Sequence, residues 1–386
     1  MNTFFDLVGF EFKKMLCRKR TVIVLALVII VSAVSVFGTI IGNIYYYDES
    51  GKEISVSKYS VAMTERRGGE ELSGRVIDAD LIMEAKAYNT TNKYDNFVNV
   101  MVTRYFDYDT ERFFNLTREQ AERFDEIRRD KLKSSITSSA SENVQKYRLE
   151  CIDNSPAPLT YEYFGGYYRF VTIMYTTAIM AGAAIAVMLS GIFSDEYASG
   201  ADSLILSSRH GKGLVIGAKL FTTFSVSAAL ITLLSAMSFI ETTIVWGPNG
   251  ANAMLEFVRD VFPYPIMIGQ AVLLYFICML TACAMFAAIT ILLSAKLKLP
   301  FNTLIITVVL LIVPLFIQID APVWVYRLIN LLPTNMFTFW NVMGEYQYEI
   351  FGLVVPPYVF LPIFALTVAA VCSYFAYRAF RKHQVN

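Results

Sequence analysis

The chain has 386 residues, of which 55% are hydrophobic, and its mean hydropathy is +0.47. Soluble domains rarely have so apolar a composition, so we expect a membrane protein. Lysine plus arginine and aspartate plus glutamate both number 33, so the net charge is zero and favours no class of partner.

The five cysteines and two histidines predict neither a disulfide within the polar part of the chain nor a metal site. Cys151 is the one cysteine of that polar part. Cys278 and Cys283 lie five apart in an apolar run, a spacing that suits packing better than metal binding. His210 and His383 are far apart in the sequence, so no histidine cluster supports a metal.

Residues 1–20 predict an amphipathic helix in the membrane interface, although a plain cytoplasmic tail is the alternative. Its apolar residues recur at helical spacing: Phe4, Phe5, Val8, Phe12, Met15 and Leu16. A basic cluster follows that anionic lipid would attract: Lys13, Lys14, Arg18, Lys19 and Arg20.

Residues 21–45 predict the first membrane span. No charge occurs from Thr21 to Ile44, which is long enough to cross a hydrocarbon core of about 30 Å. The run is too long for a signal peptide and has no Ala-x-Ala cleavage site, so we expect it to be retained. Tyr45 to Tyr47 fit an aromatic belt at the span exit.

Residues 46–165 predict a mainly helical extracellular domain, large enough for its own small core. Helices are expected at about 71–88, 117–133 and 141–151, with a serine-rich linker at 134–141. Thr117 and Gln120 form a capping-box pattern at the start of the second helix.

Residues 166–386 predict five further spans, so the fold class is an all-α membrane protein with six transmembrane helices. The expected spans are 167–193, 214–243, 266–295, 301–319 and 358–377. The span at 167–193 has a stripe of small residues, which suits helix packing within one chain or across a dimer equally well. The span at 214–243 is rich in Ser and Thr, which either line a transport path or form hydrogen bonds within their own helix. Short helices at 324–329 and 335–342 are expected to dip into the membrane and return.

A polar loop at residues 194–213 separates the second and third spans, with its acidic residues first and its basic residues last. Asp195 is expected to cap the start of a short helix, because its carboxylate accepts from free amides of the first turn. Gly211 and Gly213 are expected to end the helix. Such a helix lies along the membrane surface between two spans. If a partner protein displaced it, the motion would be transmitted to both spans.

The loop resembles the cytoplasmic loop of ABC exporter permeases of the type-2 class. The resemblance rests on Glu196, Gly200, Leu204, Ser207-Ser208-Arg209 and Gly217-Ala218-Lys219. Ser208 stands where that family often has proline. The resemblance implies a coupling helix that docks on a separate ATPase subunit, with Asp195, Glu196, Gly200, Leu204 and Arg209 as the coupling residues. Glu196 would meet a basic or amide group of the ATPase, and Leu204 would fill its groove.

The basic residues flanking the spans predict that both termini lie in the cytoplasm of a multi-pass plasma-membrane protein. Lys296, Lys298 and Arg378 then lie inside with the N-terminal cluster, whereas the short outer loops carry only Arg259 and Arg327. The insert and all three tryptophans are expected outside, and the 194–213 loop inside.

Several catalytic signatures are missing from the sequence. Gly211-Lys212 lacks the earlier glycine and the hydroxyl residue of a phosphate-binding loop, so we expect no ATPase site and no cofactor in this chain. ATP and Mg would be bound by the partner ATPase. No ionisable residue lies at mid-span, which argues against an ion-coupled carrier.

The prediction is therefore an ABC exporter permease that works with a dimer of ATPase subunits and a second permease chain, identical or homologous. The substrate is expected to be an amphiphile or a peptide, and the acidic insert either engages a cationic peptide or is a solvated surface. The alternatives are a membrane sensor with an extracellular ligand-binding domain and a membrane enzyme, for which no paired catalytic group is found.

Overall fold

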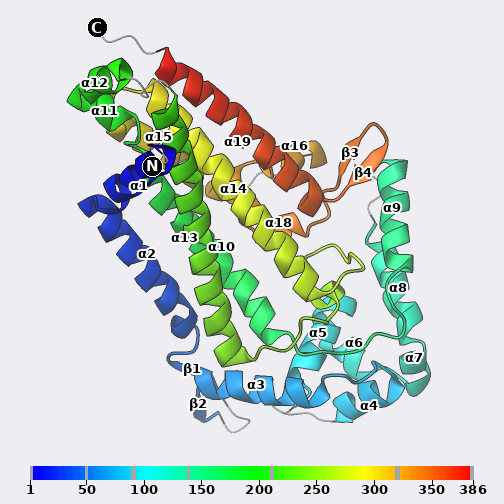
Figure 1. Ribbon diagram of the computed structural model, residues 1–386. Coiled ribbons are helices and arrows are strands. Elements are labelled where there is room, and N and C mark those ends of the chain that lie inside the picture. The colour runs from blue at the N-terminus through cyan, green and yellow to red at the C-terminus, as the bar shows by residue number, and fades with distance from the viewer. Residues whose placement is uncertain are drawn as a thin grey trace.

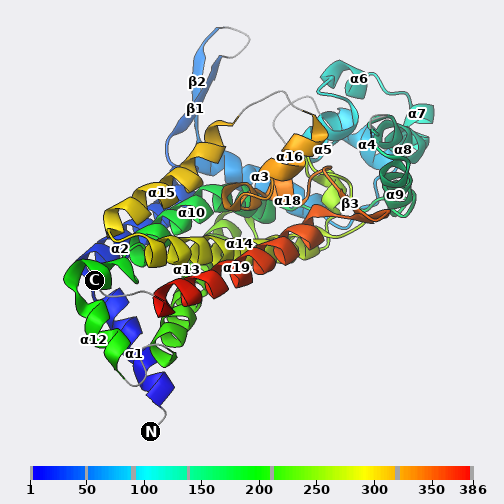
Figure 2. The same cartoon turned by 90° about the horizontal axis from the view of Figure 1, so that it is seen from above.

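The computed structural model describes residues 3–47, 51–87, 93–136, 140–208, 213–317 and 322–382. Within these ranges the chain is mostly helical, with two small two-stranded sheets. Long helices run side by side, and shorter helices gather at one end of them (Figures 1 and 2). Both termini lie at the opposite end, near α1 and α12.

Five helices are long and apolar enough to cross a membrane. They are α2 (Lys19–Gly38), α10 (Gly165–Leu189), α13 (Leu214–Trp246), α14 (Ile268–Lys296) and α19 (Pro357–Arg381). α1 (Thr3–Leu16) precedes them and packs against α13. The predicted helix before the first span and five of the six predicted spans are thus present as helices.

The predicted fifth span, 301–319, is shorter than expected. Its α-helix, α15, covers Pro300–Ile312 and continues as the 3₁₀-helix η2 (Val313–Phe316). Pro314 explains the change, because it has no N–H for the α-helical bond and its ring would clash with a carbonyl of the preceding turn. Together the two pieces are roughly 28 Å long, and residues 318–321 lie outside the described ranges.

Short elements connect α15 to α19. They are α16 (Val323–Ile329), α17 (Pro333–Met336), α18 (Phe339–Val342), β3 (Tyr348–Ile350) and β4 (Leu353–Val355). The two predicted short helices are therefore present, the second divided by Thr338 into α17 and α18. β3 and β4 form an antiparallel hairpin that the sequence did not reveal.

The insert between α2 and α10 begins with an unpredicted antiparallel hairpin, β1 (Asn43–Tyr47) and β2 (Glu53–Ser57). Its helices are α3 (Lys58–Leu72), α4 (Ala79–Ala87), α5 (Asp95–Tyr105), α6 (Thr110–Phe114), α7 (Arg118–Glu122), α8 (Phe124–Ser134) and α9 (Glu142–Asp153). The helix expected at 71–88 is confirmed only as α4, and the one at 117–133 is divided at Arg123. The capping box of Thr117 and Gln120 is present.

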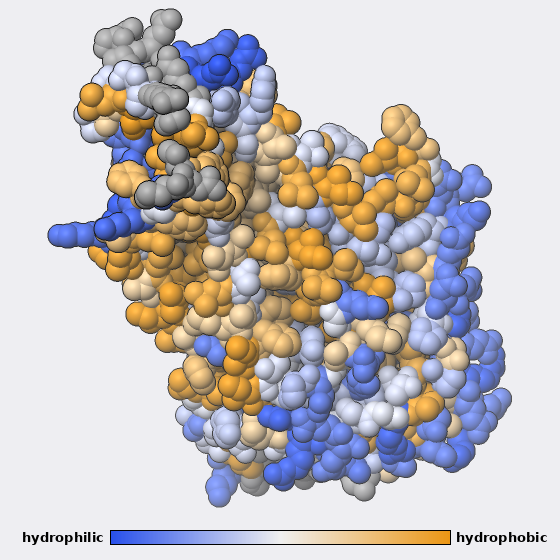
Figure 3. Space-filling view, viewed as in Figure 1, coloured by the Kyte–Doolittle hydropathy of each residue, from blue (hydrophilic) through white to orange (hydrophobic). Residues whose placement is uncertain are grey.

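The buried side chains of the insert continue into those of the long helices. Most of those described belong to one cluster that includes residues of both parts. Arg128 of α8 is fully buried and its Nη1 lies 3.0 Å from Glu256 of η1 (Leu255–Phe257), in the loop between α13 and α14. On the face seen in Figure 3, apolar residues predominate over the long helices and polar residues predominate over the insert. The insert is therefore joined to the ends of the helices that lie away from both termini.

The start of α10 lies against the end of α13 with no room for a side chain. A Cβ at Gly166 would lie 2.2 Å from the carbonyl oxygen of Gly247. We expect Gly166→Ala to separate the two helices there and to cost about 1–3 kcal/mol, measured as a lower melting temperature of the purified protein in detergent. Gly9→Ala is the matched control, because a Cβ there meets nothing within 4 Å. Equal melting temperatures of the two variants would contradict the close approach.

Candidate functional site

The 194–213 loop forms two short helices at the end of the molecule where both termini lie (Figures 1 and 2). α11 covers Ser194–Ser199 and α12 covers Ala201–Ser207. Gly200 separates them with φ +69°, a left-handed conformation that other residues rarely adopt. The glycine that the resemblance singled out therefore fixes the angle between the two helices.

α11 is firmly anchored to the neighbouring long helices. The backbone amides of Phe193 and Ser194 donate to Ser294 Oγ of α14, at 3.1 and 3.2 Å. The Tyr197 hydroxyl donates to the carbonyl of Ala295 at 3.0 Å, and its ring stacks on Phe380 of α19. A displacement of α11 must therefore move α14 and α19 as well.

α12 carries the exposed part of the loop. Leu204 is 76% exposed, whereas Asp202 is buried and Ile205 packs against the core. A leucine so exposed on a short helix loses apolar contact with its own chain, and burial against a partner would recover about 1.5–3 kcal/mol. Arg209, Gly211 and the rest of 209–212 lie outside the described residues, so the expectations for them are not tested.

Glu196 of α11 lies in a largely buried group of charges, which we call the inner ion cluster because it is at the end of the molecule with both termini: Glu11, Lys14, Glu196 and Lys219, of which only Lys14 is partly exposed. Its Oε1 accepts from Lys219 Nζ at 2.6 Å and from Lys14 Nζ at 2.7 Å. Lys219, on α13, is fully buried and also contacts Glu11 of α1 at 3.2 Å. Glu196 is only 3% exposed, so its partners are lysines of its own chain rather than groups at the surface.

Asp195 has a different role from the one expected. Phe193 occupies the N-cap position of α11 and no side chain caps the helix. The carboxylate of Asp195 instead accepts from Arg20 at 2.6 Å and from Arg18, both beside the start of α2. Asp195 and Glu196 together tie α11 to α1 and α2, so the loop is bonded to both N-terminal helices.

Two members of the inner ion cluster were missed in the sequence. The sequence predicts that Lys14 and its basic neighbours contact anionic lipid, and it predicts no partner for Glu11. Glu11 follows Val8 by three residues and precedes Met15 by four, so it lies on the face of α1 that these buried residues occupy. An acid on an apolar face is the signal that predicts a buried basic partner.

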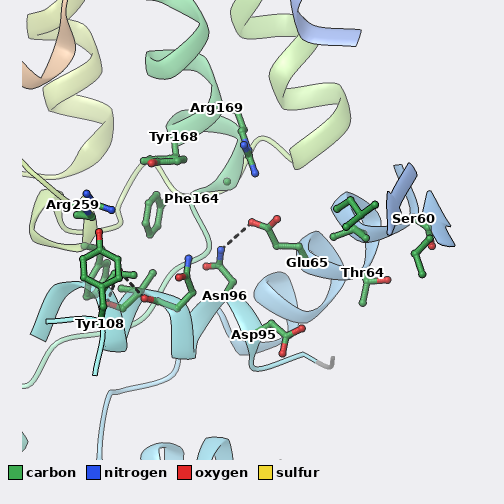
Figure 4. Close-up of a pocket in the computed structure, with 18 residues that line it drawn as sticks. Ser60, Thr64, Glu65, Asp95, Asn96, Tyr108, Phe164, Tyr168, Arg169 and Arg259 are labelled. Carbon is green, nitrogen blue, oxygen red and sulfur yellow. Dashed lines mark hydrogen bonds between the residues drawn. The ribbon is translucent and has the colours of Figure 1, made fainter. Parts of the chain in front are cut away.

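A second site lies at the other end of the molecule, in a cavity of about 820 Å³. We call it the outer cavity because it is at the end of the molecule away from both termini, and it lies between the insert helices α3 and α5 and the start of α10 (Figure 4). Its polar lining includes Glu65, Asp95, Asn96 and Arg169, and its apolar lining includes Phe164. The sequence predicted an acidic insert, and the lining of this cavity contains both acidic and basic side chains.

Glu65 is held at the wall of the outer cavity by Asn96, whose amide donates to its carboxylate at 3.0 Å (Figure 4). Burial raises the pKa of Glu65 above its usual value, against the opposing effects of Arg169 and of the Asn96 hydrogen bond. Raising the pKa means that the site disfavours the bare carboxylate. A cation placed beside Glu65 would relieve this cost.

In the described ranges, no three His, Cys, Asp or Glu side chains are grouped so as to hold a metal ion. Comparison with known proteins gives no match to a protein-family model, to a curated protein or to a solved structure.

Proposed function

We propose that the chain is the permease subunit of an ATP-driven exporter of the type-2 ABC class, coupled to a separate ATPase through α11 and α12. The observation that carries the proposal is the contrast between the two helices. α11 is bonded to α14 and to the N-terminal helices, whereas α12 presents Leu204 outward. A force applied to α12 would therefore pass through Gly200 into the long helices.

The proposal includes an arrangement in the plasma membrane. The end with α11, α12 and both termini faces the cytoplasm, where ATP and Mg are available to the partner. α15 with η2 supplies the sixth crossing, because a chain that enters α19 from the insert end must first return to that end. Two such chains would pair with two ATPase chains, and the substrate would be an amphiphile or a peptide.

Replacing Leu204 by aspartate tests the coupling surface. We expect Leu204→Asp to reduce the co-purification of a stoichiometric ATP-binding subunit about tenfold or more, since a desolvated apolar anchor often contributes 2 kcal/mol or more to an interface. The readouts are the amount of bound subunit and the ATPase activity of the purified complex. Melting temperature should stay unchanged, because Leu204 has little contact with its own chain.

Leu149→Asp in α9 is the matched control, since Leu149 is 40% exposed and lies in the insert. Loss of the subunit from both variants, or from neither, would contradict the proposal. Glu196→Arg is a poorer test, because it would put a third cation beside Lys14 and Lys219 and disturb the fold itself.

The outer cavity favours a second candidate, a membrane sensor that binds a ligand outside and signals inward. A sensor needs no ATPase. A purified chain that binds a ligand through the insert, and that recruits no ATP-binding subunit under any condition, would favour the sensor.

A further inference from the structure

We propose that the outer cavity binds the headgroup of a zwitterionic glycerophospholipid with a primary ammonium, with Arg169 on the phosphate and Glu65 on the ammonium. Both side chains line the cavity, from α10 and α3 respectively, and both project toward the same space (Figure 4).

The cavity lies where lipid headgroups would be. Its wall includes Gly165 and Tyr168 of the first turn of α10, so it borders the end of an apolar span. It also includes Ile44 and Val56, which face each other across the β1–β2 hairpin a few residues after α2 ends at Gly38. This apolar pair beside the ends of two spans gives acyl chains a place next to the charged part of the cavity.

Arg169 is the cation available for a phosphate. It forms no ion pair or hydrogen bond with another described residue, and its guanidinium instead lies over the ring of Trp246 at 5.4 Å. Arg259, the other arginine of the wall, is already paired with Asp260 at 2.6 Å and lies over Tyr108. A guanidinium supported by an indole ring keeps its donors free for a phosphate, which it binds in a bidentate manner.

Glu65 is the group available for the ammonium. One oxygen accepts from Asn96, which leaves further lone pairs for a donor. The half-buried carboxylate gains from a neighbouring cation more than an exposed one would. Thr64, Asn99 and Thr103 add neutral hydrogen-bonding groups to the wall. A headgroup with both charges matches this wall better than an anionic one, which has a phosphate for Arg169 but no ammonium for Glu65.

The volume agrees with this occupant. About 820 Å³ falls within the range of small-molecule sites, roughly 300–1,000 Å³. A headgroup with its glycerol fits such a space, whereas whole acyl chains need the bilayer beside it. The role of the site in receiving an exported lipid rests on the proposed function, but binding itself does not require an ATPase.

The test measures lipid binding to the full chain, purified in detergent without any ATPase, by native mass spectrometry. Phosphatidylethanolamine is titrated against phosphatidylglycerol and phosphatidylcholine. We expect phosphatidylethanolamine to bind best. Arg169→Gln should weaken its binding about tenfold or more, because a charge-assisted pair is lost. Glu65→Gln should weaken it and raise the relative binding of phosphatidylglycerol. Arg169→Lys should restore part of the affinity, which a purely structural defect would not allow.

The matched controls lie on α3 beside Glu65. Arg67→Gln and Glu71→Gln change the same charges at exposed positions outside the cavity and should bind as the unchanged protein does. A thermal melt of each variant separates lost binding from lost folding.

Other results would overturn the inference. Equal binding of the three lipids, or full binding by Arg169→Gln, would remove the assigned roles. If soluble glycerophosphoethanolamine bound as tightly as the lipid, the source of the ligand would not be the membrane. If Glu65→Gln weakened the binding of a cationic peptide and left lipid binding unchanged, the occupant of the cavity would be a peptide. Lipid binding by a chain that co-purifies with no ATP-binding subunit in the Leu204 experiment would contradict the proposed function and leave the headgroup site intact.

Discussion

Lys219→Met is expected to destabilise the protein strongly, by about 3–5 kcal/mol, because it leaves Glu11 buried without its cation and Glu196 with Lys14 alone. Lys219 has no exposed surface, so water cannot replace its ammonium. The measurement is thermal unfolding in detergent, followed by the reactivity of the buried Cys278 and Cys283 thiols in a Cys17→Ser background, since Cys17 is exposed.

A compensated variant distinguishes charge from packing. Lys219→Met with Glu11→Gln keeps the Lys14–Glu196 pair and a neutral cluster, so we expect most of the lost stability to return. Lys298→Met is the control, because Lys298 is exposed near the same end of the molecule. If the double variant were as unstable as the single one, the loss would come from packing and the charge argument would fail.

Arg128→Met is expected to release part of the insert and to cost about 3–5 kcal/mol, because Glu256 would remain buried without its cation. The carboxylate of Glu256 accepts from Tyr105 and from Ser155, both at 2.8 Å, but neither neutralises its charge. Limited proteolysis of the insert and a thermal melt measure the effect.

The companion variant is Arg128→Met with Glu256→Gln, since a glutamine still accepts from Tyr105 and Ser155. We expect it to resist proteolysis almost as well as the unchanged protein. Arg118→Met removes a pair with Asp80 in which both side chains are more than 60% exposed, so it should change stability by no more than about 1 kcal/mol. If Arg118→Met were cleaved as fast as Arg128→Met, the buried ion pair would stabilise the insert no more than the exposed one does.

The sequence predicted best the elements whose signals are local. The uncharged run after Thr21 predicted α2, and Thr117 with Gln120 predicted the start of α7. α3 was missed because Gly68 and Gly69 interrupt its pattern; in the structure a Cβ at either would collide with Lys93 or Tyr163. Such glycines come from contacts between distant segments, which no local pattern reveals.

The candidate site likewise has features that local sequence signals predict and features that depend on contacts between distant segments. The sequence predicted one short helix in the loop, whereas the structure has two, α11 and α12, divided at Gly200. The surroundings of Glu196 were not predicted, because Glu11 and Lys219 are distant in the sequence and meet only when α1 packs on α13. A carboxylate in a polar loop gives no local sign that it will be buried.

The attachment of the insert to Glu256 has a consequence for how the protein can be divided. Besides Arg128, the insert contributes Tyr161, whose ring lies against Phe257, and Arg148, which donates to Gln347 beside β3 at 3.0 Å. Cutting out residues 46–165 would therefore uncover apolar and charged surface on both halves. We therefore expect that the insert cannot be exchanged or expressed alone, and that this end of the molecule folds only as the whole chain folds.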